Sequence, residues 1–93
     1  MKKYNYLGNG EVHLNKTTYP SGLTKLTLVD AEDGMSFATC TVPFSDLEKN
    51  EVAVKDYSEN EGMLEFLVKN HIVQAPHRFI ESGFVKIPVC KLK

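Results

Sequence analysis

One stretch of this 93-residue chain has the spacing of a helix, and the rest has the alternation and turn residues of short strands. The helical stretch is KDYSENEGMLEFLVKNHIV, residues 55–73. Ser58 followed three residues later by Glu61 is typical of a capping box, which predicts that the helix begins at this point. Apolar side chains then recur at helical spacing, at Met63, Leu64, Phe66 and Leu67. The sequence therefore predicts one helix with one apolar face.

Strand-like runs account for most of the remaining chain, separated by Gly, Pro and Asp-Gly turns. These runs are residues 12–19, 23–29, 35–44, 51–57 and a last hairpin within 77–92. Pro88 interrupts the final run and indicates an edge strand or a bulge there. The order β-β-β-β-α-β-β predicts an α+β fold, in which one helix packs on one face of a twisted antiparallel sheet of about five to six strands. We expect the whole chain, residues 1–93, to form one domain.

Composition and cysteine content favour a small cytoplasmic protein. The apolar fraction of 42% and the charged fraction of 25% are those of a globular chain. The N-terminal lysines are not followed by the apolar segment of a signal peptide. Cys40 and Cys90 lie in apolar runs and are too few for a disulfide framework, so we expect both to be buried, reduced thiols.

The sequence offers no pattern typical of catalysis or metal binding. The histidines and cysteines are scattered without the spacing of a metal site, at His13, His71, His77, Cys40 and Cys90. A glycosidase-like carboxylate pair needs a cleft that a chain of this length scarcely permits. We expect no enzyme activity, no catalytic residue, no metal and no cofactor.

Acidic residues are concentrated in the middle of the chain. Residues 30–65 hold ten of the twelve acids and only two lysines. Most of these acids have a local explanation as turn residues or as partners of the helix N-terminus. If they project in one direction, however, they form an acidic face that attracts a basic protein surface. The candidate interface residues are Glu32, Asp33, Asp56, Tyr57, Glu59 and Glu61.

A nucleic-acid surface is the alternative, and it would lie in the C-terminal hairpin. Its basic residues are Arg78, Lys86 and Lys91. Phe79 and Phe84 are interleaved with them and could stack on bases, although a place in the core is the favoured interpretation of both. The oligomeric state is open between a monomer and a homodimer that pairs edge strands.

Two segments, TYPSGLTKLTLVDAEDGMSFATCTV and ESGFVKIPVCKL, resemble a family of small uncharacterised proteins, described only as a domain of unknown function. The similarity covers most of residues 17–92, and its most specific part is DAEDG followed by SFATCTV. Members are encoded on phages, plasmids and integrative elements of Gram-positive gut bacteria. The resemblance implies a mobile-element protein that binds and modulates host or defence machinery, and it brings no catalytic residues. The chain departs from the family pattern at Cys90, where an aromatic residue is more usual.

Overall fold

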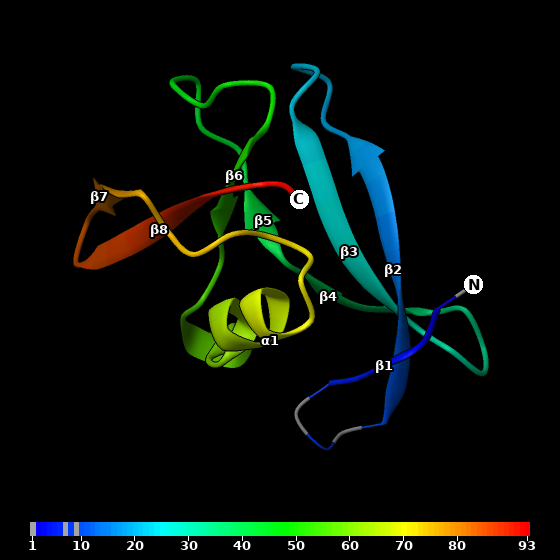
Figure 1. Ribbon diagram of the computed structural model, residues 1–93. Helices are drawn as coiled ribbons and strands as arrows, with labels where there is room; N and C mark the ends of the chain where they lie inside the picture. Colours follow the sequence, from blue (N-terminus) through cyan, green and yellow to red (C-terminus); the bar gives the residue numbers. More distant parts are fainter. Residues whose placement is uncertain (1, 7, 9) are drawn as a thin grey trace.

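The structure is a computed structural model that describes residues 2–6, 8 and 10–93. It contains two antiparallel sheets of four strands each and one short α-helix (Figure 1). The predicted α+β class with a single helix is confirmed. The strands, however, divide between two sheets, whereas the sequence predicted one sheet of five to six strands.

The first sheet is an antiparallel meander in the order β1-β2-β3-β4. Its strands are β1 (Tyr4–Asn5), β2 (Glu11–Thr18), β3 (Thr24–Asp30) and β4 (Ser36–Thr39). The predicted turn between β2 and β3 is present, with the Gly22 amide donating to the Tyr19 carbonyl at 2.8 Å. Gly22 has a φ of 90°, which only glycine adopts readily.

The chain passes from the first sheet to the second at Cys40. The sequence predicted one strand over 35–44, but the structure breaks it into β4 and β5 (Thr41–Val42), which belong to different sheets. The Cys40 amide donates to the Leu26 carbonyl in β3 at 2.8 Å, and the Cys40 carbonyl accepts from the Lys55 amide at 2.8 Å. One residue therefore bonds to both sheets and forms the corner between them.

The second sheet has the order β5-β6-β8-β7, with β6 at Glu51–Val54, β7 at Arg78–Ser82 and β8 at Val85–Lys91. The prediction that Pro88 marks an edge strand is wrong, because β8 lies between β6 and β7. The residues of β8 that pair with β6 run from Val89 to Lys91, so this pairing begins one residue after Pro88. The missing proline N–H therefore falls where β6 no longer needs a partner.

The helical segment starts later than the sequence predicted. A 3-10 turn spans Ser58–Asn60, and the α-helix α1 spans Met63–Lys69. The predicted Ser58 cap is wrong, because the residue before α1 is Gly62, with a φ of 97°. Asp56 supplies the missing acceptor: its Oδ1 accepts from the amides of Gly62 and Leu64 at 3.0 and 2.9 Å. A carboxylate six residues upstream therefore caps this helix.

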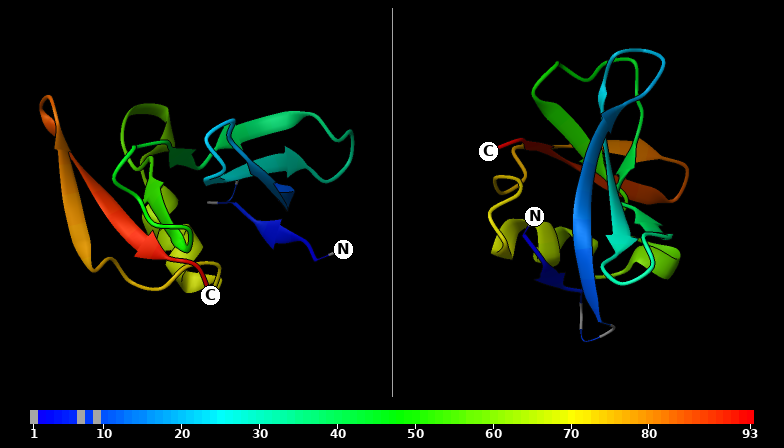
Figure 2. Two further views of the ribbon diagram at one scale, coloured as in Figure 1. Left: turned by 90° about the horizontal axis from the view of Figure 1, so that it is seen from above. Right: turned by 90° about the vertical axis from the view of Figure 1, so that its right-hand side faces the viewer.

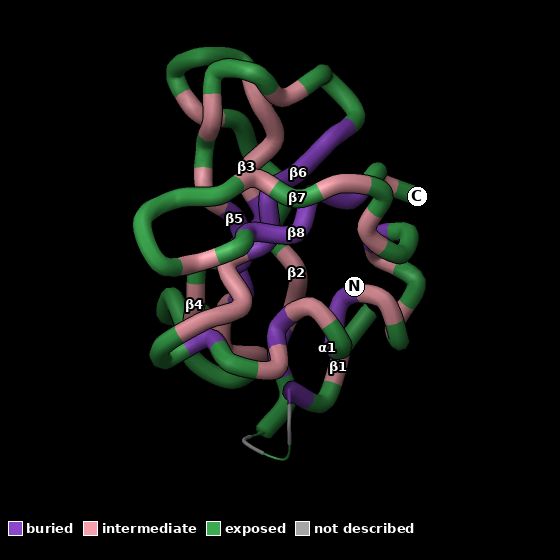
Figure 3. The backbone as a smooth tube through the Cα atoms, turned by 90° about the vertical axis from the view of Figure 1, so that its left-hand side faces the viewer, coloured by how far each residue is buried: buried purple, intermediate pink, exposed green. Residues whose placement is uncertain are grey.

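The main core lies where the two sheets and α1 meet, and Figure 3 shows the buried residues gathered in the middle of the molecule. It contains residues from every one of these elements, among them Leu26, Leu28, Val54, Leu67 and Cys90. A smaller cluster of Ala53, Ile87 and Val89 lies apart from it, with partly buried neighbours that include Tyr57 and Ile80. β6 contributes Val52 and Val54 to the main core and Ala53 to the smaller cluster, so both faces of this strand are buried.

Candidate functional site

The acidic residues predicted to form one face fall into two separate groups. Glu32 and Asp33 lie in the turn between β3 and β4, at the right of Figure 1, whereas residues 56–61 precede α1 at the lower left. The view from above in Figure 2 also separates these two segments. Asn60 is anchored to the far end of β4 by its Nδ2, which donates to the Thr39 carbonyl at 2.7 Å. β4 alone adds about 10 Å between that anchor and the turn.

In the group before α1, two of the three carboxylates are engaged in interactions within the protein. Asp56 caps the helix, and Glu59 forms an ion pair with Lys55 at 2.5 Å. The hydrogen bond from Lys55 lowers the pKa of Glu59 to about 2. Tyr57 is half-buried against the smaller apolar cluster rather than displayed as an anchor. Glu61 is exposed.

In the turn group, the acids lie beside exposed apolar side chains. The backbone of this turn is fixed by Asp30, whose Oδ1 accepts from the Glu32 amide at 2.8 Å, and by Asp33, whose Oδ1 accepts from the Met35 amide at 2.9 Å. The side chains of Met35 and Phe37 follow directly and are 67% and 42% exposed. We define Glu32, Asp33, Met35 and Phe37 as the turn surface. It extends from the β3–β4 turn into β4, an outer strand of the first sheet, which contains Phe37.

Sequence reasoning identified the acids of the turn surface but missed its apolar part. The sequence predicts a strand that contains Met35 and Phe37 but does not indicate which face of that strand is exposed. Phe37 packs edge-on against buried Tyr6, with ring centroids 5.5 Å apart, and this contact covers only part of its ring. The available signal was that Met35 and Phe37 are two residues apart in the predicted strand 35–44, since alternate residues of a strand share a face.

The favoured interpretation of Phe79 and Phe84 as core residues is wrong. Phe79 in β7 is 58% exposed, and Phe84 in the β7–β8 turn is fully exposed. Figures 1 and 2 show the turn of the β7–β8 hairpin projecting from the body, although Ile87, Val89 and Cys90 of β8 are buried. Lys86 is also exposed and lies opposite Glu81 in the hairpin register. We define Phe79, Phe84 and Lys86 as the hairpin surface.

Arg78, a candidate nucleic-acid residue, is held by acids instead. Its Nη2 donates to Glu51 Oε1 at 2.8 Å and to the Asp46 carbonyl at 3.1 Å, and its Nε donates to Glu51 Oε2 at 3.3 Å. His77 Nε2 lies 2.5 Å from the same carboxylate. This network ties the loop before β6 to the start of β7. The guanidinium is therefore already occupied, whereas Lys86 and Lys91 are exposed.

Glu51 is the central acid of this network, and sequence reasoning did not single it out. Its side chain is only 5% exposed. Hydrogen bonds from Arg78, then from the Glu48 amide and His77, lower its pKa to about 2 against the opposing effect of burial. Asp46, Glu48 and Lys91 line an open cleft of about 490 Å³ around it. The charge of the Glu51 carboxylate is balanced by Arg78, so we interpret this network as structural: it holds the loop before β6 against the start of β7.

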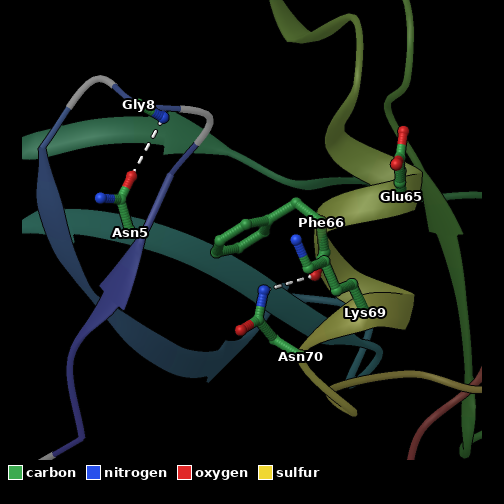
Figure 4. A pocket seen from close by; sticks show the side chains of 6 residues that line it. All are labelled: Asn5, Gly8, Glu65, Phe66, Lys69 and Asn70. Carbon is green, nitrogen blue, oxygen red and sulfur yellow. Dashed lines mark hydrogen bonds between the residues drawn. The ribbon is translucent and has the colours of Figure 1, made fainter.

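A second cleft, of about 370 Å³, lies between β1 and α1 (Figure 4). Phe66 forms its apolar floor, and the ring is directed toward β1, while the Glu65 carboxylate points away. The polar groups at its rim are partly satisfied within the fold: Asn5 Oδ1 accepts from the Gly8 amide and Asn70 Nδ2 donates to the Phe66 carbonyl. The cleft therefore offers little convergent polar chemistry to a ligand.

Both cysteines are buried and free, as the sequence predicted. Burial raises the pKa of Cys40 to about 12 and that of Cys90 to about 11, so neither thiol is poised as a nucleophile. Among the described residues, no group of His, Cys, Asp and Glu could hold a metal ion. In the same part of the chain, no helix has the length and apolarity needed to cross a membrane.

Comparisons with known proteins supply no family. No family model, no curated protein and no solved structure matches this chain. The similarity to uncharacterised mobile-element proteins therefore stays a prediction from the sequence.

Proposed function

We propose that this chain is a non-enzymatic protein-binding module whose contact region is the turn surface. The observation that carries the proposal is the placement of exposed Met35 and Phe37 directly after Glu32 and Asp33. Apolar side chains supply most of the affinity at protein interfaces, while surrounding charges supply orientation and association rate. The turn surface combines both kinds of side chain, and this combination favours it over a surface that is only acidic or only apolar.

The partner is a protein with a basic surface next to an apolar pocket. β4 adds a second means of recognition, because an outer strand can accept an extended segment of another chain. In line with the resemblance, we propose that the protein acts in the cytoplasm as a modulator encoded by a mobile genetic element. Its acids would occupy a basic surface of a host or defence protein that otherwise contacts nucleic acid.

Affinity capture with two charge-matched variants tests this proposal. The turn variant carries Glu32→Lys with Asp33→Asn, because asparagine keeps the side-chain oxygen that accepts from the Met35 amide. The control carries Glu61→Lys with Glu59→Gln, which changes the net charge equally in the group before α1. We expect wild type and control to retain one partner from a Gram-positive bacterial lysate and the turn variant to lose it. Equal retention by all three proteins, or loss from the control alone, would contradict the proposal.

A second candidate function is nucleic-acid binding through the β7–β8 hairpin. Exposed Phe79 and Phe84 near Lys86 favour it, since aromatic rings and cations bind single strands. Engagement of Arg78 by Glu51 and Asp46 weakens it. This candidate predicts retardation of a single-stranded oligonucleotide at low salt, with a marked loss in the variant Lys86→Gln with Lys91→Gln. An unretarded oligonucleotide at about 50 mM salt would exclude it.

A further inference from the structure

Phe37 of the turn surface lies at an irregular point of β4. The register of β4 against β3 shifts there: Ala38 lies opposite Leu28. The next residue of β3, Val29, lies opposite Ser36, so Phe37 is an extra residue without a Cα partner in β3. Such a β-bulge interrupts the regular alternation of a strand and redirects the side chain at that point. The direction of the Phe37 ring therefore depends on contacts outside the β3–β4 ladder.

Tyr6 supplies such a contact. The rings of Tyr6 and Phe37 lie edge to face, with centroids 5.5 Å apart and an interplanar angle of 82°. Tyr6 is buried in the main core, whereas Phe37 is 42% exposed. Tyr6 therefore touches the turn surface from the interior of the protein without being available to a partner itself.

The Tyr6 ring is supported in turn by α1 and by the β1–β2 hairpin. Phe66 of α1 packs edge to face against Tyr6, with centroids 5.0 Å apart. Phe66 is buried, and Figure 4 shows its ring directed toward β1. The Tyr6 amide donates to the Gly10 carbonyl at 3.1 Å, which fixes the backbone at this position. The ring that meets Phe37 is therefore held from two sides.

We propose that Tyr6 is a positioning residue of the turn surface, which holds the Phe37 ring in one orientation and leaves its exposed part ready for a partner. A side chain that is ordered before binding loses less conformational entropy when the partner arrives. The consequence for affinity rests on the proposed function. The orientation of the ring does not, because it is a property of the free protein.

NMR of the free protein tests the orientation with two substitutions at one position. Tyr6→Phe keeps the ring and removes only the hydroxyl, whereas Tyr6→Leu removes the ring. Three-bond couplings to the Phe37 Cγ report whether χ1 occupies one staggered rotamer or several. We expect one rotamer in wild type and in Tyr6→Phe, and averaged couplings in Tyr6→Leu. Val73→Ala truncates another residue of the same core and should keep one rotamer, which controls for lower stability.

Affinity for the captured partner tests the consequence for binding. Tyr6→Leu should weaken binding about two- to tenfold, the range that an edge-to-face aromatic pair contributes. Tyr6→Phe and Val73→Ala should bind as wild type does. Phe37→Ala should weaken binding at least about tenfold. Addition of Tyr6→Leu to Phe37→Ala should cause no further loss, because the ring that Tyr6 positions is then absent.

Each contrary result overturns a stated part of the inference. Averaged couplings in wild type exclude a fixed ring, even if Tyr6→Leu does not fold. One rotamer in folded Tyr6→Leu would show that β4 alone holds Phe37, and averaged couplings in Tyr6→Phe would assign the effect to the hydroxyl. Unchanged affinity in Tyr6→Leu, equal loss in Val73→Ala or additive loss in the double variant would exclude positioning as the cause of binding. If wild type captures no partner, the proposed function fails, while the couplings still decide whether Tyr6 positions Phe37.

Discussion

The two acidic groups of this protein differ in what the fold does with them. Before α1, Asp56 caps the helix and Glu59 pairs with Lys55. In the β3–β4 turn, Asp33 fixes the turn through one oxygen, and both it and Glu32 stay exposed beside Met35 and Phe37. Charge density along the sequence is therefore a poor guide to recognition. An acid becomes available to a partner only where hydrogen bonds within the fold do not already use it.

The largest effect should come from Glu51, the acid that the fold uses most completely. Glu51→Gln removes the charge that holds Arg78 and His77, and we expect a loss of about 2–3 kcal/mol in the free energy of unfolding. Urea denaturation measures this loss. Glu48→Gln is the matched control, because Glu48 bonds to Glu51 through its backbone alone: its amide donates to the Glu51 carboxylate and its carbonyl accepts from the Glu51 amide. Equal stability of the two variants would show that the network contributes little.

Acid should weaken the same network. The pKa of Glu51 is about 2 in the folded protein and about 4.5 when unperturbed. Since the folded value is lower, the contribution is complete above the unfolded pKa and is lost as pH falls from about 4.5 toward 2. The stability difference between wild type and Glu51→Gln should shrink by about 2–3 kcal/mol over this range in urea titrations at successive pH values. A difference independent of pH would contradict the assignment.

Asp56 should have an intermediate effect. Asp56→Ala leaves the amides of Gly62 and Leu64 without their acceptor, and we expect a loss of about 1–2 kcal/mol. Thermal denaturation measures the loss, and amide hydrogen exchange at these two residues localises it. Glu61→Ala, at an exposed position in the same segment, serves as the control. Unchanged exchange at Gly62 and Leu64 would rule out the capping role.

The smallest effect on stability should come from the turn surface. Glu32→Lys with Asp33→Asn keeps the side-chain acceptor of the turn, so the melting temperature should match that of wild type. Circular dichroism on heating provides the measurement. A clear drop in melting temperature would mean that these acids, like those before α1, mainly support the fold.

Much of the fold could be predicted from the sequence because its signals are local. Turn residues such as Asp33-Gly34 and Gly22 fix hairpins by their own backbone preferences. The corner at Cys40 could not be predicted, since it depends on partners in β3 and after β6. The helix start was misplaced because its cap comes from Asp56, outside the usual spacing.

The candidate site was less predictable than the fold. Phe79 and Phe84 have the composition of core residues, and only the projection of their hairpin explains their exposure. The Glu51 network joins residues 26 and 27 positions apart in the chain, which no local pattern encodes. The acids of the turn surface could be identified from the sequence. Their distance in space from residues 56–61, however, depends on the three-dimensional path of the chain, which the sequence does not reveal.

An NMR titration with the captured partner tests the central claim most directly. Amide and methyl spectra of wild type would be followed as the partner is added at moderate salt. The proposed function predicts the largest shift changes at Glu32, Asp33, Phe37 and the Met35 methyl, with little change at Glu59 and Glu61. Changes concentrated at residues 56–61, with the β3–β4 turn unaffected, would contradict it.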